Sequence, residues 1–375
     1  MHSDVQPFRA IAISARAHAL QAEGRSIIHM EFGQPSTGAP PSAIATAHRV
    51  LDQDPMGYWE SPALRQRLAL HYRDSYGLEI EPNRFALTCG ASPALVLALL
   101  SRFAHGARIA LARPGYVAYR NTLRALGMVP VEIACDASTR FQLTASLIAS
   151  LDPAPAGVIV ASPANPTGTI IDAAGLAAIA EVCRARGITI ISDEIYHGLS
   201  YGPRTHSLLE FEPNALVINS FSKYFSMAGW RLGWLLVPPD LVTRARSYLG
   251  NLFLSAPSLS QHAGLAAFED RDVLNSHVQV YRRNRERLVN ALPHMGISKI
   301  APPEGAFYIY ADMSHLTNDS FSLCKEVLED TGIALAPGVD FDPVEGHRFV
   351  RISFAVSEAQ TEAAIGRLRQ WLKRR

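Results

Sequence analysis

Short apolar runs alternate with longer helix-forming stretches from about Phe85 to Val237, and no other feature of this sequence constrains the fold as strongly. Strands separated by helices pair in parallel, because each helix carries the chain back to the same end of the sheet. A sheet of this kind is covered by helices on both faces. The alternation therefore predicts a large α/β domain built on a mostly parallel sheet.

Lys223 lies just after one of these apolar runs. The run 216–219 predicts a short buried strand, and the polar loop after it contains Ser220, Ser222 and the lysine. Open α/β sheets bind ligands at the carboxyl ends of their strands. The two hydroxyl groups, and Arg231 further along, suit an anion beside an amine that acts as a nucleophile. A lone lysine in a polar turn is an ordinary surface residue, so this interpretation depends on the other runs.

Two upstream runs also end in polar groups. The run 188–192 leads to the carboxylate of Asp193 and the phenol of Tyr196. The run 157–161 leads to an extended loop with two X-Pro steps, where Asn165 offers both a donor and an acceptor. An aspartate after a strand is most often a helix cap, and an Asn-Pro step is usually only a turn.

A third upstream run, 85–88, leads to Gly90 and then to Ala91 and Ser92 at the start of a helix-forming stretch. A strand, a glycine turn and a helix amino terminus can form a phosphate cradle from backbone amides and the helix dipole, although the arrangement is also common in α/β proteins. Together, the four strand ends supply a phosphate site, a carboxylate, a phenol, an amide, a lysine and an arginine. This set suits an anionic aromatic cofactor that carries an aldehyde.

The ordered set of motifs resembles the class I/II aminotransferases of fold type I, which depend on pyridoxal 5′-phosphate. The resemblance covers nearly the whole chain, from Glu31-Phe32-Gly33-Gln34-Pro35 to the segment 348–355. It implies a large domain with a mostly parallel, seven-stranded type of sheet and a smaller α+β domain. It also implies transfer of an amino group between an L-amino acid and a 2-oxo acid by a ping-pong mechanism, in a homodimer.

The resemblance also implies residue roles. Lys223 would form the Schiff base with the cofactor and shuttle the proton, Asp193 would pair with the pyridine nitrogen, and Tyr116 would stack on the ring. The implied cofactor contacts are Tyr58, Gly90, Ala91, Ser92, Tyr116, Asn165, Asp193, Tyr196, Ser220, Ser222, Lys223 and Arg231. Among them, Tyr196 and Asn165 would contact the ring hydroxyl oxygen, and Ala91, Ser92, Ser220 and Arg231 would hold the phosphate. The implied substrate contacts are Gly33, Asn165 and Arg351, with Arg351 on the α-carboxylate, and no metal is implied.

Physical chemistry supports three of these roles. A carboxylate such as Asp193 keeps a pyridine nitrogen protonated and so maintains the ring as an electron sink. Desolvation and the neighbouring cation Arg231 would lower the pKa of Lys223. The planar fork of Arg351 would bind both oxygens of a carboxylate, although an arginine on a strand can also be a surface residue.

Composition agrees with a small-molecule enzyme. A formal net charge of +1 gives no electrostatic footprint for nucleic acid or a membrane. The four cysteines are scattered without a metal or disulfide spacing, which indicates a reducing cytoplasm. No apolar run reaches the roughly 20 residues of a membrane helix, and residues 1–7 lack the parts of a signal peptide.

After Val237 the alternation of short apolar runs and helical stretches ends, and this change predicts a second domain. Long helical stretches are followed by expected strands at 306–310 and 349–354, with a helix near 322–329 between them. We predict a large cofactor-binding domain over residues 34–270. Residues 1–33 and 271–375 are predicted to form the smaller α+β domain.

The segment Gly57-Tyr58-Trp59-Glu60-Ser61-Pro62 departs from the family pattern, because the loop after Tyr58 is short and lacks glycine. The resemblance would send Tyr58 across a dimer interface to the partner's phosphate. The substrate is not marked by a motif, since no single arginine is set apart for a side-chain carboxylate. Phe32, Phe307 and Tyr308 could form an apolar pocket for a neutral or aromatic donor, or could be core residues.

Three other functions share parts of this pattern. A carbon–sulfur β-lyase, or a related α-carbon lyase or synthase such as a cyclopropane-forming enzyme, would use the same fold and lysine. A transcriptional regulator with an aminotransferase-like domain would need a winged-helix segment ahead of Gly33, where we expect none. A nicotinamide-dependent dehydrogenase would need a Gly-x-Gly-x-x-Gly fingerprint after the first strand, which the sequence lacks.

Overall fold

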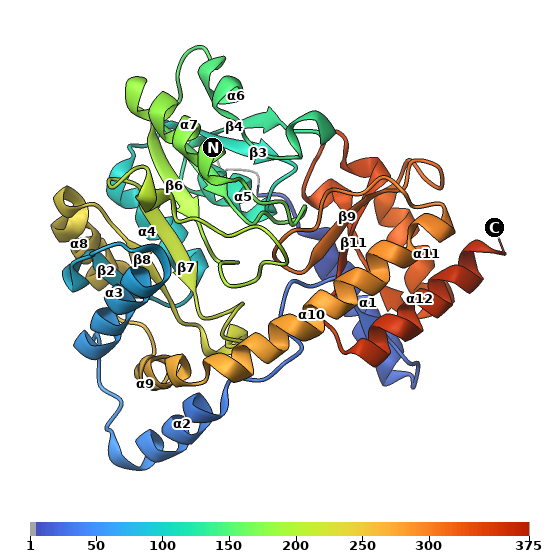
Figure 1. The fold of residues 1–375 in the computed structure, drawn as a ribbon, viewed down its shortest axis with the longest axis horizontal. Helices are drawn as coiled ribbons and strands as arrows, with labels where there is room; N and C mark the ends of the chain where they lie inside the picture. Colours follow the sequence, from blue (N-terminus) through green and yellow to red (C-terminus); the bar gives the residue numbers. More distant parts are fainter. Residues whose placement is uncertain (1–4, 375) are drawn as a thin grey trace.

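The computed structural model describes residues 5–374 and consists of two lobes (Figure 1). The larger lobe contains the main sheet, and the smaller lobe contains the carboxyl-terminal elements together with the amino-terminal helix α1. The long helix α10 runs from the large lobe into the small one. The α-helices are α1 Arg9–Ala22, α2 Pro41–Gln53, α3 Pro62–Tyr76, α4 Ala91–Arg102, α5 Val117–Ala125, α6 Ala145–Ala149, α7 Ala173–Ala185, α8 Val242–Leu252, α9 Ser258–Ala266, α10 Arg271–Ala291, α11 Ser320–Thr331 and α12 Glu358–Leu372.

The main sheet has seven strands in the order β2-β8-β7-β6-β5-β3-β4. Only β8 runs antiparallel to its neighbours β2 and β7, and the other pairings in this sheet are parallel. The predicted α/β fold with a mostly parallel sheet is therefore confirmed. The strands are β2 Phe85–Thr88, β3 Arg108–Arg113, β4 Val129–Ala134, β5 Gly157–Ala161, β6 Thr189–Asp193, β7 Leu216–Ser220 and β8 Gly233–Leu236.

Alternate residues of the strands face two separate helical layers. One face packs against α3, α6, α7 and α9, and its strand residues include Val158, Ile190 and Val217. The other face packs against α4, α5 and α8, and its strand residues include Ile159 and Ile191. Because side chains alternate along a strand, only a strand that is apolar throughout can fill both layers.

Strand β8 holds two strand ends together. Its residue Gly233 is paired with Thr88 at the end of β2 and with Ser220 at the end of β7. A Cβ atom at Gly233 would lie 2.8 Å from the carbonyl oxygen of Asn219 and 2.8 Å from the carbonyl carbon of Gly90. A glycine is therefore required at this crossing of backbones.

The small lobe contains a three-stranded antiparallel sheet, β11-β12-β9, and a parallel pair, β1-β10. The expected strand 306–310 begins later, because Ala306 has φ 54° and turns the backbone before the strand starts. A residue in this left-handed region interrupts an extended strand. The strands of this lobe are β1 Ile28–His29, β9 Tyr308–Asp312, β10 Ile333–Ala334, β11 Ala336–Pro337 and β12 Phe349–Ser353.

The division into residues 34–270 and 1–33 with 271–375 remains a prediction. A core of the small lobe combines buried residues from α1, α10, α11 and α12 with Tyr196, Leu199 and Tyr201 from the large lobe. Helix α10 begins at Arg271, next to the predicted boundary. Among the helices of residues 5–374, none combines the length and hydrophobicity needed to cross a bilayer.

Candidate active site

A cavity of about 500 Å³ lies where the ends of β6 and β7 meet residues of the small lobe. Most of the residues predicted for the site come together in its lining. Those residues are Gly33, Ala91, Ser92, Tyr116, Asn165, Asp193, Tyr196, Ser222, Lys223, Arg231 and Arg351.

Lys223 reaches into this cavity from the loop after β7. Its Nζ donates a hydrogen bond to the carbonyl oxygen of Gly33, which comes from the amino-terminal segment. The pKa of Lys223 falls to about 8, mainly because of burial and next because of the positive charge of Arg351. Arg231 acts in the same direction with a smaller effect, while Asp193 opposes both. The lowered pKa brings the free amine close to neutral pH, as a lysine nucleophile requires.

Asp193 is the last residue of β6 and is buried. Its Oδ2 accepts a 2.5 Å hydrogen bond from the hydroxyl of Tyr119, and its Oδ1 accepts one from the backbone N–H of Ile195 at 3.1 Å. Burial raises the pKa of Asp193, whereas these two hydrogen bonds and the charge of Lys223 oppose the rise. The carboxyl group is thus fixed in orientation at the cavity wall.

The amino terminus of α4 forms one end of the cavity. Gly90 precedes this helix with φ 96°, and no side chain caps the first-turn amides. A Cβ atom at Gly90 would lie 2.6 Å from Nη2 of Arg231, whose guanidinium donates to the carbonyl oxygens of Cys89 and Ala228. Unpaired amides, a helix dipole and a guanidinium together make a site for a phosphate.

Arg351 lies in β12 of the small lobe and is only 2 % exposed, so it is not a surface residue. Its Nη1 donates to Oδ1 of Asn165 at 2.9 Å, and its Nη2 donates to the carbonyl oxygen of Glu31. The guanidinium carbon lies 4.4 Å from the ring centre of Tyr308. Its Nε has no hydrogen-bond partner among the residues that the structure describes. A buried donor of this kind leaves the arginine able to bind a further acceptor.

Tyr196 and Tyr308 form a pair of phenols at the base of the cavity. Their hydroxyl groups are 2.6 Å apart, and burial raises the pKa of both. Tyr308 also limits the space near Gly33, where a Cβ atom would lie 1.7 Å from its hydroxyl oxygen. Phe32 lines the cavity as well, whereas Phe307 is wholly buried in the core of the small lobe.

Three predicted residues lie outside the cavity lining. Gly90 precedes α4 and lies against the guanidinium of Arg231, which does line the cavity. The hydroxyl of Ser220 is 2.7 Å from that of Ser222 and donates to the carbonyl oxygen of Leu232. Tyr58 is 84 % exposed and lies away from the cavity of its own chain.

Tyr119 and Phe8 are the two aromatic lining residues that reasoning from the sequence missed. Tyr119 was missed although it follows Tyr116 by one helical turn, a spacing that places both phenols on one face of α5. Phe8 lines the cavity from the start of the chain, and no local pattern signals it, because only the fold brings it to β6 and β7.

Comparison with known proteins agrees with this geometry. A sequence profile of the family described as aminotransferase class I and II matches residues 25–368. The chain belongs to this family. It is 44 % identical to a valine–pyruvate aminotransferase of Mycobacterium tuberculosis, over 99 % of this chain and 98 % of that protein.

Solved structures of aminotransferases share the whole fold. A crystal structure of an aminotransferase from Mycobacterium tuberculosis matches with a TM-score of 0.98 and 43 % identity, covering 100 % of this chain and 99 % of that one. The aspartate aminotransferase of Thermus thermophilus, solved with maleate, matches with a TM-score of 0.91 and 28 % identity, covering 98 % and 97 %. The predicted family, fold type and enzyme class are therefore confirmed.

The enzyme is an aminotransferase that moves an amino group between an L-amino acid and a 2-oxo acid, and its cofactor is pyridoxal 5′-phosphate. The residues at the cavity fit this cofactor. The amides at α4 and the guanidinium of Arg231 suit its phosphate, and the space between them depends on the missing Cβ of Gly90. Asp193 suits the pyridine nitrogen, and Lys223 supplies the amine.

Proposed function

We propose that this aminotransferase takes its amino group from neutral aliphatic amino acids such as valine and passes it to pyruvate or a similar 2-oxo acid. The character of the cavity lining carries this proposal. The lysine and arginine side chains in the lining are Lys223, Arg231 and Arg351, each with a role already proposed. Phe8, Phe32, Leu95 and Ile195 make other parts of the lining apolar.

The name of the valine–pyruvate relative supports the same choice of substrates. A distal carboxylate on the donor would be desolvated beside these apolar side chains without a partner of its own. Burying an unpaired charge is strongly unfavourable. We therefore expect aspartate and glutamate to be poor donors.

In the proposed mechanism, Lys223 acts as the base and acid of the reaction. Its Nζ takes the proton from the α-carbon of the bound amino acid and later releases it, and a pKa of about 8 suits both directions near neutral pH. The carbonyl oxygen of Gly33 orients this amine through its hydrogen bond. Pyridoxal phosphate, when bound, supplies the ring that accepts the electron pair left on the α-carbon.

Asp193 is proposed to hold a proton on the pyridine nitrogen, with Tyr119 fixing the carboxylate in place. Arg351 is proposed to bind the α-carboxylate of every substrate, since its guanidinium is already oriented by Asn165 and by the carbonyl of Glu31. Tyr116 is proposed to stack on the ring, because it lines the cavity at the start of α5.

The remaining contacts and the assembly are proposals as well. Ala91, Ser92, Ser220, Ser222 and Arg231 would hold the phosphate, and Tyr196 with Asn165 would contact the ring hydroxyl. The high exposure of Tyr58 supports a homodimer in which this residue reaches the partner's site. The cysteines Cys89, Cys135, Cys183 and Cys324 form no disulfide, which supports a cytoplasmic location.

A panel of donors tests the proposed substrate class. The purified holoenzyme is mixed with valine, alanine, phenylalanine or aspartate, and conversion of the cofactor to its amine form is followed by absorbance. We expect the highest kcat/KM with valine and at least a 100-fold lower value with aspartate, about 2.7 kcal/mol of lost binding in the transition state. Equal efficiency with aspartate would overturn the proposal.

A further inference from the structure

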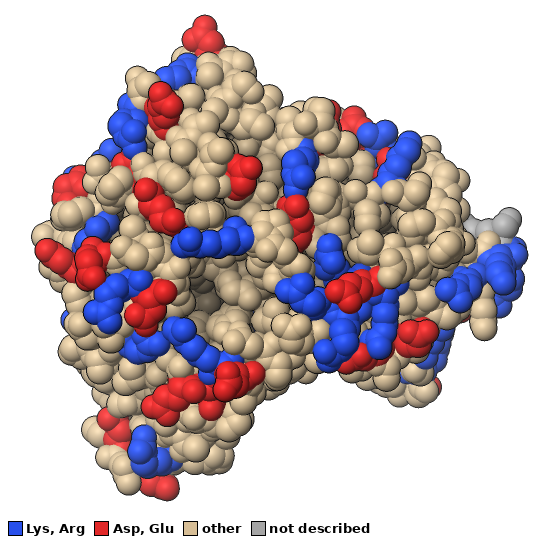
Figure 2. All heavy atoms as spheres, viewed as in Figure 1, with Lys and Arg blue, Asp and Glu red and all other residues tan. Residues whose placement is uncertain are grey.

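A second cavity, of about 270 Å³, lies directly behind the active site. It is bounded by α3, the ends of β6 and β7, and the start of α10. The face drawn in Figure 2 is hollowed in this part of the molecule, and Lys and Arg side chains flank the hollow. Of its lining residues, only Ser220 also has a role in the proposed cofactor site.

The two cavities share their walls. At the end of β6 and in the segment after it, Asp193 and Tyr196 line the active site, whereas His197 lines the second cavity. In the loop after β7, Lys223 lines the active site, whereas Tyr224 lines the second cavity. The loops that carry the catalytic groups therefore separate two spaces.

The mouth of the second cavity is positively charged. Arg204 and Arg271 line it, and both are exposed. Arg271 forms no ion pair within residues 5–374, and Arg204 approaches Glu210 only to 3.9 Å while donating to the carbonyl oxygen of Ser75. No aspartate or glutamate lines the cavity. An anion at this mouth would therefore contact guanidinium groups directly, whereas Asp74 and Asp272 act on the lining residues His71 and Tyr224 from outside the cavity.

The positive charge near the cavity affects the pKa of His71, which is part of its lining. The pKa of His71 falls to about 4, mainly because of burial and then because of the charges of Arg271 and Arg67, with Asp74 opposing them. Arg67 itself packs over the ring of Phe268, with 4.3 Å between the guanidinium carbon and the ring centre. Cations that disfavour a positive histidine favour a negative ligand in the same place.

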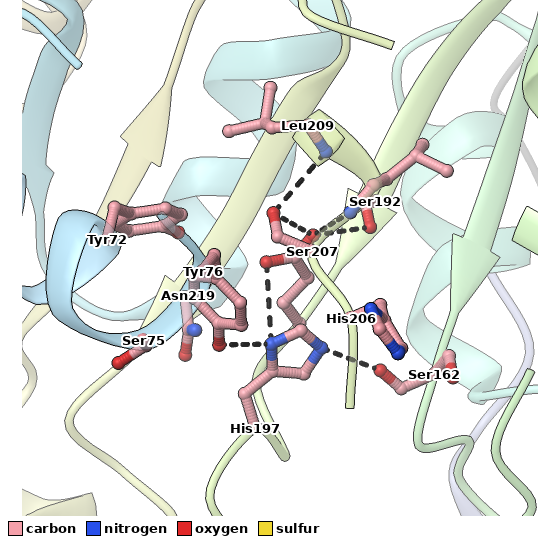
Figure 3. A network of polar contacts seen from close by, with 12 residues as sticks. Tyr72, Ser75, Tyr76, Ser162, Ser192, His197, His206, Ser207, Leu209 and Asn219 are labelled. Carbon is pink, nitrogen blue, oxygen red and sulfur yellow. Dashed lines mark hydrogen bonds and ion pairs between the residues drawn. The ribbon is translucent and has the colours of Figure 1, made fainter. Parts of the chain in front are cut away.

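The depth of the cavity is aromatic. Phe225, Trp234 and Phe268 line it, and each is buried. His197 is fixed as a neutral ring: its Nε2 donates to the carbonyl oxygen of Ser162, and its Nδ1 accepts from the hydroxyl of Tyr76 (Figure 3). Flat apolar walls below a cationic mouth complement a molecule with an aromatic body and a negative end.

We propose that this second cavity is a ligand site for a small aromatic carboxylate. The carboxylate lies between Arg204 and Arg271, and the ring lies against Phe225, Trp234 and Phe268. The site is separate from the α-carboxylate position at Arg351, which belongs to the first cavity.

Benzoate is the probe that tests this site, because it has the stated chemistry and carries no amino or keto group. The holoenzyme is titrated with benzoate in a calorimeter, and the same titration is made with Arg204→Gln/Arg271→Gln. A control, Arg73→Gln, removes an exposed arginine of α3 that does not line the cavity. A second control, Arg351→Lys, weakens the only other carboxylate site proposed for the chain.

We expect saturable binding whose Kd rises at least about fivefold in the Arg204→Gln/Arg271→Gln enzyme and stays within about twofold in both controls. Both substituted arginines are exposed, so valine turnover by the double variant should match the parent and report correct folding. Loss of benzoate binding in Arg351→Lys would overturn the proposal, because the probe would then occupy the active site. A smaller rise in the double variant, or no saturable heat with the parent, would also overturn it.

Discussion

Asp193 and Glu194 are adjacent buried carboxyl groups at the end of β6, yet their surroundings differ completely. Asp193 faces the active-site cavity, where Lys223 supplies a positive charge. Glu194 faces away from it, and its Oε1 accepts from the hydroxyls of Ser192 and Ser207 and from the N–H of Leu208 at 2.9 to 3.0 Å. Its Oε2 lies 3.6 Å from Nδ1 of His197, within the network of Figure 3.

The difference shows how one strand end serves two purposes. Burial raises the pKa of Glu194 to about 8, so this group is mostly neutral at pH 7 and acts as an uncharged hub of hydrogen bonds. Burial also raises the pKa of Asp193, but its hydrogen bonds with Tyr119 and Ile195 and the charge of Lys223 oppose that rise and favour the charged form. Residues on the cavity side should therefore control rate, and residues on the Glu194 side should control stability.

Lys223→Ala should give the largest effect, a near-complete loss of turnover. Alanine offers no amine, so we expect turnover to fall to a small percentage of the parent or less, while the protein stays folded and retains some cofactor through its phosphate contacts. Activity with valine and circular dichroism measure the two properties. Lys299→Ala, at an exposed lysine, is the control. A variant that kept an appreciable rate would show that another group moves the proton.

Asp193→Asn should lower kcat by roughly two orders of magnitude or more, because a neutral amide does not hold the pyridine nitrogen protonated. The variant should still bind the cofactor, as its absorbance would show. Asp172→Asn removes charge from a helix-capping carboxylate and provides the matched control. If both variants worked at near-parental rates, Asp193 would have only a structural role.

Arg351→Lys should raise KM for amino and keto substrates alike and leave cofactor affinity nearly unchanged. Lysine replaces a two-point contact by a single charge, which should cost about 2 to 4 kcal/mol, or roughly 30- to 1000-fold in kcat/KM. Efficiencies for alanine, phenylalanine and glutamate, with Arg348→Lys as control, measure this. A loss confined to glutamate would assign Arg351 to a distal carboxylate.

Glu194→Gln should leave the rate unchanged and alter the pH dependence of stability. The pKa of Glu194 is about 8 in the folded protein, above the ordinary glutamate value of 4.5, so its contribution to stability is fully present below pH 4.5 and is lost progressively as the pH rises through 8. The parent should lose up to about 1.4 kcal/mol per pH unit relative to the variant in this window.

Urea unfolding at pH 6.5, 7.5 and 8.5 provides the free energies of unfolding for this comparison. The titration of His197 affects the free energy of unfolding between its folded pKa of about 3 and the ordinary histidine value of 6.5, which is at or below the lowest pH measured. Glu286→Gln, at an exposed helical position, should show no such trend. Parallel curves for the parent and Glu194→Gln would mean that Glu194 is already charged in the folded protein.

Tyr119→Phe should give the smallest effect, a fall of about 3- to 10-fold in kcat/KM from the lost hydrogen bond to Asp193. Because that hydrogen bond lowers the pKa of Asp193, its removal should move the acidic limb of the pH–rate profile to higher pH. Tyr76→Phe removes a hydroxyl on the Glu194 side and should leave the limb in place. An unmoved limb in Tyr119→Phe would limit Tyr119 to packing.

The sequence predicted the elements whose signals are local. Lys223, Asp193, Asn165 and Gly90 each follow an apolar run, and parallel strands bring such ends to one edge of a sheet. The same reasoning named desolvation and Arg231 as the causes of a lowered Lys223 pKa, but it missed Arg351, whose effect is second only to burial. That order depends on how the small lobe packs over the sheet, which no run of residues encodes locally.

Phe8 and the second cavity escaped prediction for the same reason. Phe8 reaches the site through the packing of α1 on the small lobe. The second cavity joins α3, α10 and two loops whose residues are far apart in sequence. The position of Phe8 and the second cavity both depend on contacts between residues far apart in sequence, and no local sequence pattern indicates those contacts.

Because Gly233 pairs with both Thr88 and Ser220, strand β8 sets the distance between the two ends of the cofactor site. These pairings are made by the backbone, so the spacing between the start of α4 and the backbone of the loop that carries Lys223 does not depend on side-chain contacts. Substitutions around Phe8, Phe32 or Tyr308 can therefore change which amino acid is accepted, while the distance set by β8 stays the same. The backbone thus fixes the distance between the two anchoring regions of the cofactor, whereas the side chains of the lining determine which substrates fit.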